Sequence, residues 1–152
     1  MSGNVQQQQY HSIVGKMEVP YHNFAGALAS NFFIQLRDKA KITGTRCSKC
    51  NKVYVPPKSV CGYCFSNLDS LVEVGTTGTL QTFTEVSYKE TVQPIDPPFV
   101  YGVVKLDGAD TGMVHFIGEV KLADIKIGMK VQAVFKDKRE GNILDIKYFK
   151  PV

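Results

Sequence analysis

The placement of the cysteines constrains this chain more than any other feature. All four lie in one short stretch with the spacing C-x2-C-x10-C-x2-C, as Cys47, Cys50, Cys61 and Cys64. Two such hooks together present four thiolates to one metal ion in a tetrahedron. Two disulfides are the alternative, but disulfides are rare in the cytoplasm, and a redox dithiol needs only one pair. The spacing therefore predicts a metal site.

Zinc is the metal we expect at these thiolates. A four-thiolate site accepts zinc or iron. Nothing else in the sequence suggests electron transfer, so a rubredoxin-like iron centre is the alternative. With every position taken by protein, none is left for a reactive water, and such a site is structural. The ion replaces the core that a segment of about twenty residues cannot build. We place this zinc ribbon at residues 43–68.

The composition is that of a globular protein with mild charge. The chain has 152 residues, a formal net charge of +4 and 43% hydrophobic residues. No apolar run approaches the ~20 residues that span a membrane, and the start MSGNVQQQQYHS lacks the pattern of a signal peptide. We expect a cytoplasmic protein without a membrane partner. The lysines are scattered, which disfavours nucleic acid as a partner and leaves room for an anionic ligand.

Two segments precede the ribbon. Residues 1–22 are polar and irregular, with four glutamines in a row, and we expect a flexible tail. Residues 23–42 are expected to form a helical arm, with a helix over 24–40 and Asn23 as its N-cap. Its apolar side chains recur at four-residue spacing, as Leu28, Phe32 and Leu36. The helix either packs on its own domain or docks on a partner.

Residues 69–152 show the hydrophobic patterns of β-strands. Five segments alternate or are continuously apolar between turns: TGTLQTFTEVSYKE, PPFVYGVVKLDG, GMVHFIGEV, MKVQAVFKDK and NILDIKYFKPV. Five strands of this length predict a mainly β fold that closes as a small Greek-key barrel of the OB type, with an open sandwich as the alternative. Phe83 is the exception to the alternation, because it falls on the polar side of its strand.

The residues that would make this chain an enzyme by itself do not occur in a usable pattern. With four cysteines on a metal, no free thiol nucleophile remains, and His11, His22 and His115 are isolated in the sequence. No G-x-S-x-G, P-loop or Rossmann fingerprint occurs. We therefore expect no catalytic residue here.

The order of these features resembles a known family. The stretches RCSKC, VYVPPKSVCGYC, VGTTGTLQTFTEV, PPFVYGVVKLD and IGMKVQAVF are similar to those of the bacterial and archaeal zinc-ribbon OB-fold proteins of acyl-CoA metabolism. The resemblance implies a non-catalytic accessory subunit, in a hetero-oligomer with a thiolase-like catalytic subunit, that helps to bind or channel acyl-CoA. The small size fits a two-subunit thiolase. Cleavage of benzoylsuccinyl-CoA in anaerobic toluene degradation is the reaction that the resemblance suggests.

Two residues depart from the family's pattern. Asn51 and Phe65 stand where glycine usually follows each hook. Asparagine tolerates a left-handed backbone, whereas phenylalanine does so poorly. We therefore expect the second knuckle to differ in shape from the first.

A subunit that holds acyl-CoA needs an apolar groove and cations for the phosphates. The aromatic candidates lie on the expected strands, as Phe83, Tyr88, Phe99 and Tyr101, and each is also a candidate for the barrel core. Two cations, Arg46 and Lys58, flank the ribbon and could meet the phosphates. The residues that we single out as ligand-binding are Arg46, Lys58, Phe83 and Tyr101. The alternative function is an OB-fold module that binds single-stranded nucleic acid on aromatic platforms.

Overall fold

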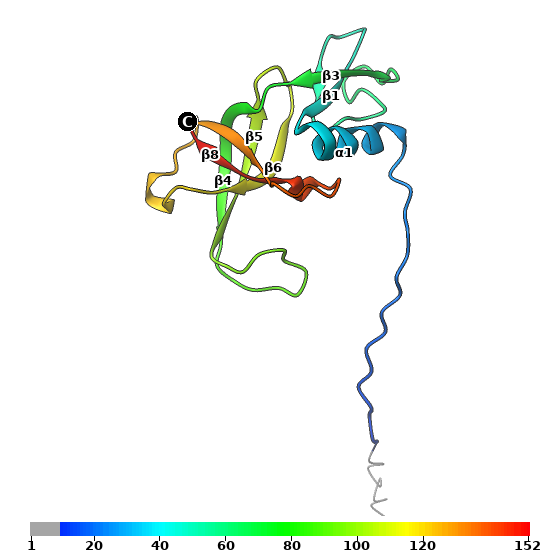
Figure 1. The fold of residues 1–152 in the computed structure, drawn as a ribbon, viewed down its shortest axis with the longest axis vertical. Helices are drawn as coiled ribbons and strands as arrows, with labels where there is room; N and C mark the ends of the chain where they lie inside the picture. Colours follow the sequence, from blue (N-terminus) through cyan, green and yellow to red (C-terminus); the bar gives the residue numbers. More distant parts are fainter. Residues whose placement is uncertain (1–9) are drawn as a thin grey trace, which may run out of the picture.

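The computed structural model describes residues 10–152 and consists of a helix, a small sheet and a barrel (Figure 1). Helix α1 (Ala27–Lys39) leads into a three-stranded sheet of order β2-β1-β3, formed by β1 (Ile42–Arg46), β2 (Val53–Tyr54) and β3 (Ser70–Val74). The barrel strands are β4 (Thr77–Val86), β5 (Phe99–Leu106), β6 (Gly112–Ile117), β7 (Lys130–Phe135) and β8 (Ile146–Pro151). Two 3-10 turns, η1 (Leu122–Asp124) and η2 (Ile143–Asp145), precede β7 and β8.

The barrel has the strand order β4-β5-β6-β8-β7 and closes on itself, which excludes the open sandwich. Neighbouring strands are antiparallel except β6 and β8, which run parallel and pair only at Ile117 and Phe149. This is the arrangement of an OB-fold. The predicted fold class is therefore confirmed: mainly β, with an N-terminal helix, a four-cysteine ribbon and a five-stranded closed barrel.

A bulge in β4 explains why Phe83 breaks the alternation. The pairing of β4 with β5 steps from Leu80 to Thr82 without a partner for Gln81. One extra residue shifts the side-chain alternation by one position. Leu80 is therefore fully buried, and Phe83 packs against the same core from further along the strand.

Helix α1 begins later than predicted. Gly26 occupies the N-cap position with a φ of 82° and no side-chain cap hydrogen bond, so the expectation that Asn23 caps the helix is wrong. A glycine in this left-handed conformation interrupts the helical path before the first turn. Phe32 and Leu36 are 1% and 0% exposed and belong to the same core as the barrel strands. The helix therefore packs on its own chain.

The ribbon sheet is fastened to the barrel through the turn between β5 and β6. Asp110 accepts a hydrogen bond from the N–H of Val53 at 2.8 Å and donates its own N–H to the Val53 carbonyl at 2.8 Å. The Thr111 hydroxyl contacts the N–H and the carbonyl of Val55 at 2.9 and 3.0 Å. Val53 and Val55 are buried in the core that includes the barrel residues. One continuous core thus joins helix, ribbon and barrel.

The segment before α1 lies outside this core. Residues 10–26 form neither helix nor strand and extend away from the folded body (Figure 1). The glutamine run at 6–9, which we placed in the flexible tail, lies outside the described residues. Within residues 10–152, no helix has the length and apolar character needed to cross a membrane.

Candidate metal centre

The first knuckle is a tight turn that follows β1 and runs from Cys47 to Lys52. The N–H of Cys47 donates to the carbonyl of Lys52 at 2.8 Å, and the N–H of Asn51 donates to the carbonyl of Cys47 at 2.9 Å. The N–H of Cys50 approaches the Sγ atom of Cys47 at 3.5 Å. Asn51 has a φ of 59°, and this left-handed residue turns the chain back on itself.

The second knuckle, from Cys61 to Ser66, repeats each of these contacts. The two backbone hydrogen bonds measure 2.9 and 3.0 Å, and the N–H of Cys64 approaches the Sγ of Cys61 at 3.5 Å. Phe65 has a φ of 58°, so the expectation of a different shape is wrong. The side chain of Phe65 is 80% exposed. The ring therefore makes no clash of its own, and the strain is confined to the backbone of Phe65. The hydrogen bonds of the knuckle keep this backbone in the left-handed conformation.

The knuckles bring all four cysteine sulfurs together. The Sγ atoms of Cys47, Cys50, Cys61 and Cys64 lie within 4.8 Å of one another. The pairs Cys47–Cys64 and Cys50–Cys61 are 3.5 Å apart. Zinc held by four thiolates at about 2.3 Å requires sulfurs about 3.8 Å apart at the corners of a tetrahedron. The cluster is therefore consistent with a structural zinc ion, which would leave no corner for water.

Two hydroxyl groups complete the surroundings of the sulfurs. The Oγ atom of Ser66 lies 3.2 Å from the Sγ of Cys47 and 3.1 Å from the Sγ of Cys64, so it can donate to either thiolate. The hydroxyl of Tyr54 lies 3.2 Å from the Sγ of Cys61. Outer hydroxyls of this kind orient the ligands of a metal and tune its affinity. Our sequence reasoning missed both residues. Ser66 carried a weak signal, because it closes its knuckle at the position that Lys52 occupies in the other.

These contacts change the acidity of two thiols. The Ser66 hydroxyl, together with backbone N–H groups of the knuckle, lowers the pKa of Cys47 to about 7. Burial acts to raise the pKa of Cys61, but the Tyr54 hydroxyl and nearby N–H groups outweigh it and lower that pKa to about 5. Both groups are therefore prepared to be thiolates, which is the form that binds a metal.

Cys50 shows why the cluster needs a cation. The N–H of Lys52 acts to lower its pKa, but burial and the three neighbouring sulfurs prevail and raise the pKa to about 12. Four thiolates within this distance repel one another, and a divalent ion offsets that repulsion. The donor set therefore fits zinc chemically as well as geometrically.

The two cations that we predicted as phosphate ligands each have a local partner. The Nη1 of Arg46 donates to the side-chain oxygen of Asn51 at 2.8 Å. The Nζ of Lys58 lies 5.6 Å from the centroid of the Tyr54 ring, which is a cation–π distance. Both side chains are exposed. In this structure Arg46 contacts the first knuckle and Lys58 lies over a ring of β2.

The two predicted aromatic residues lie on the barrel. Phe83 and Tyr101 line one hollow of about 330 Å³ on β4 and β5, to which neither Arg46 nor Lys58 contributes. Tyr101 also stacks on Phe116, with ring centroids 4.8 Å apart. The structure therefore brings the aromatic pair together but not the four predicted ligand residues. The other aromatic candidates differ from each other, because Tyr88 is exposed and Phe99 is buried.

Both ring nitrogens of His115 form hydrogen bonds to backbone groups of the fold. Its Nε2 lies 3.1 Å from the carbonyl of Ile143, and its Nδ1 accepts the N–H of Phe116 at 2.9 Å. These partners assign the neutral ring with the proton on Nε2. Burial lowers the pKa of His115, and the hydrogen bond to the Ile143 carbonyl opposes this shift only in part. Both nitrogens are thus engaged within the fold.

Two family models match adjacent parts of this chain. The rubredoxin-like zinc ribbon domain of ChsH2 matches residues 37–69, and the C-terminal OB-fold domain of ChsH2 matches residues 71–136. Both domains occur in the order that the structure shows. The chain belongs to the ChsH2/DUF35 family.

Members of the ChsH2/DUF35 family similar to this chain include a protein of Methanocaldococcus jannaschii described as a DUF35 domain-containing scaffold protein. It is 29% identical over 124 residues, which cover 77% of this chain and 86% of the relative. The solved structure "Ltp2-ChsH2(DUF35) aldolase" has a TM-score of 0.61 at 22% identity, covering 85% of this chain and 98% of that chain. A DUF35 protein of unknown function from Sulfolobus solfataricus has a TM-score of 0.58 at 22% identity, covering 72% and 78% of the two chains. The likenesses to solved structures establish the shared fold.

Proposed function

We propose that this chain is a non-catalytic scaffold subunit of a thiolase-type acyl-CoA enzyme. One observation carries the proposal. Every cysteine of the chain gathers in a single closed cluster, so no thiol is left to act as an acyl-accepting nucleophile. The catalytic cysteine and histidines then belong to the partner subunit.

The family supports a scaffold role with such a partner. A relative in Methanocaldococcus jannaschii is described as a scaffold protein, and a solved structure of the same fold is an Ltp2-ChsH2(DUF35) aldolase. A continuous core and a metal clip give this chain a preformed shape, and a rigid surface loses little entropy when it docks. We assign the complex to the cytoplasm, where four closely spaced thiols stay reduced.

For the ligand of the complex we propose acyl-CoA, with benzoylsuccinyl-CoA as the substrate that the catalytic subunit cleaves. The resemblance of the sequence supports this substrate. Two features of the chain support contact with a phosphate-bearing carrier. Arg46 and Lys58 are exposed cations beside the ribbon, and the apolar hollow at Phe83 and Tyr101 lies on the barrel.

Reconstitution with a candidate thiolase-like catalytic subunit tests the proposal. We expect the two chains to copurify, and CoA-dependent cleavage of benzoylsuccinyl-CoA to require both. A Cys47→Ser, Cys61→Ser double variant serves as the control, because it removes one ligand from each knuckle and should fail to restore cleavage. Full cleavage by the partner without this chain would overturn the scaffold role. Cleavage of other acyl-CoA esters but not of benzoylsuccinyl-CoA would overturn the substrate alone.

The same preparation separates this role from the nucleic-acid alternative. A single-stranded binder of the OB type needs open aromatic faces and a basic groove. Among the barrel aromatics, Phe99 and Phe116 are only 8% and 7% exposed, whereas Tyr88 is 64% exposed. Fluorescence anisotropy with a labelled oligonucleotide at low salt should show no saturable change. A salt-dependent, saturable change would favour the nucleic-acid function instead.

A further inference from the structure

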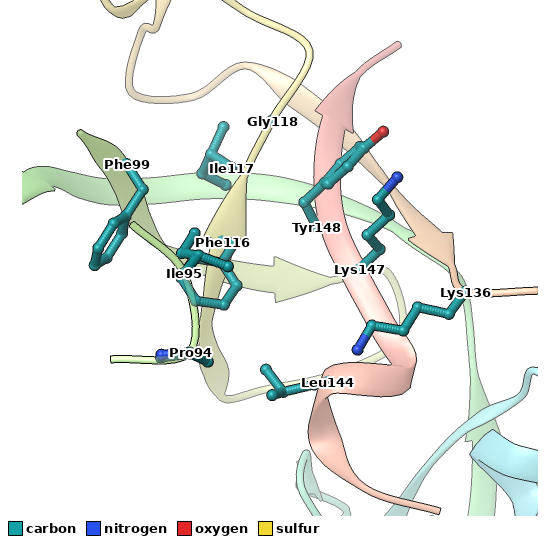
Figure 2. A pocket seen from close by; sticks show the side chains of 10 residues that line it. All are labelled: Pro94, Ile95, Phe99, Phe116, Ile117, Gly118, Lys136, Leu144, Lys147 and Tyr148. Atoms are coloured by element: carbon teal, nitrogen blue, oxygen red, sulfur yellow. The ribbon is translucent and has the colours of Figure 1, made fainter. Parts of the chain in front are cut away.

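A second cavity lies on the barrel and shares no lining residue with the metal centre or with the hollow at Phe83. It is a cleft of about 360 Å³ between β6 and β8 (Figure 2). It forms where the ladder of the barrel is shortest, since β6 and β8 pair only at Ile117 and Phe149. The loop before β5 borders one side, and the turn before β8 borders the other. In OB-folds these two loops flank the ligand-binding face.

The walls of the cleft are apolar and held in place. Figure 2 shows Ile95 beside Phe116, with Pro94 and Leu144 below them. Ile95 is 42% exposed although it borders the cleft, so apolar surface faces solvent there. The ring of Tyr148 forms a further wall, and its hydroxyl is hydrogen-bonded to Glu119, which fixes the ring. A volume of this size lies within the range of small-molecule sites.

Two lysines give the cleft its charge. Lys136 extends its amino group toward the space between Phe116 and Leu144, and Lys147 lies along the rim with its Nζ 5.4 Å from the Tyr148 ring centroid (Figure 2). Within residues 10–152, neither amino group has a carboxylate oxygen within 4.0 Å. An apolar cleft with two lysines, neither of which forms an ion pair within the chain's described residues, is complementary to a ligand with an apolar body and a negative group.

We propose that this cleft binds a small amphiphilic anion. Its apolar acyl- or aryl-sized body lies against Phe116, Ile95 and Leu144. Its anionic group is bound by Lys136, with Lys147 at the rim. The inference concerns this chain alone and does not depend on the proposed partner.

Isothermal titration of the full-length chain with phenylbutyrate tests the proposal, with phenylbutanol as the neutral probe of the same shape. We expect saturable binding of the carboxylate and binding of the alcohol weaker by at least about tenfold, since a charge-assisted hydrogen bond is lost. Lys136→Gln should weaken phenylbutyrate to the same extent. Lys138→Gln is the matched control, because Lys138 is exposed near Lys136 but does not line the cleft.

A second variant keeps the test independent of the lysine. Leu144→Glu places a negative charge inside the cleft and should abolish binding of the carboxylate, while circular dichroism reports an intact fold. Equal affinity for the acid and the alcohol would overturn the proposal. Equal effects of Lys136→Gln and Lys138→Gln, or no saturation by phenylbutyrate, would overturn it as well.

Discussion

The two knuckles of the metal centre have one backbone geometry but different side chains. Each closes through the same pair of backbone hydrogen bonds and the same N–H to sulfur contact, and each contains one left-handed residue, Asn51 or Phe65. The side chain after this residue is a lysine in the first knuckle and Ser66 in the second. Only the serine reaches the sulfurs, and it contacts one cysteine from each knuckle.

This difference separates what builds a knuckle from what tunes it. The hydrogen-bond pairs and the four converging sulfurs impose the turn even on a phenylalanine, whose intrinsic preference opposes it. The identity of the last side chain then decides how well the thiolates are stabilised. The second knuckle therefore carries both the backbone strain and the hydroxyl that supports the metal ligands.

Removing one ligand from either knuckle should have the largest effect. Cys47→Ser and Cys61→Ser are each expected to release the metal and lower Tm by roughly 10 °C or more, because the ribbon depends on the ion for its shape. The effects should be equal, since both sulfurs are fully buried and occupy matching positions. Zinc content by mass spectrometry and calorimetry check this. Full zinc occupancy in either variant would contradict a four-thiolate site.

Ser66→Ala should come next. The substitution removes the hydroxyl shared by Cys47 and Cys64, and loss of such an outer partner typically costs about 10–100-fold in metal affinity. Lys52→Ala is the matched control at the equivalent position and should leave the affinity unchanged. Competition with a chromophoric chelator measures both. Equal losses for the two variants would mean that the knuckles are chemically alike.

Replacing the left-handed residues should have the smallest effect. Phe65→Gly removes a steric cost of about 1–2 kcal/mol from the folded state. The glycine also makes the unfolded chain more flexible, which lowers the stability by roughly 0.5–1 kcal/mol. The unfolding free energy should therefore rise by about 0.5–1 kcal/mol. Asn51→Gly should change little, because asparagine already tolerates this conformation. Denaturant unfolding of the metal-loaded variants compares them. A loss of stability in Phe65→Gly would show that its exposed ring contributes contacts of its own.

The metal cluster and the barrel could be predicted because their signals are local. Cysteine spacing specifies a hook in a few residues, and alternation specifies a strand. Where the expectations were wrong or incomplete, the path of the backbone decided the outcome. Asn23 looked like a helix cap, but the backbone at Gly26 starts the helix. By alternation Phe83 falls on the polar side of its strand, but the bulge at Gln81 shifts the alternation and places Phe83 against the core.

By itself, the sequence determined that four cysteines in two C-x2-C hooks form one cluster and that the C-terminal region holds five barrel strands, because these follow from residue types at short spacings. The tertiary structure alone decided which hydroxyls reach the sulfurs and that Phe65 shares the conformation of Asn51. It also decided that Lys136, Phe116 and Leu144, from separate strands and turns, line one cleft. The physical reason is that hydrogen bonds and cavities form between segments distant in sequence, and packing, which no local pattern encodes, sets their distances.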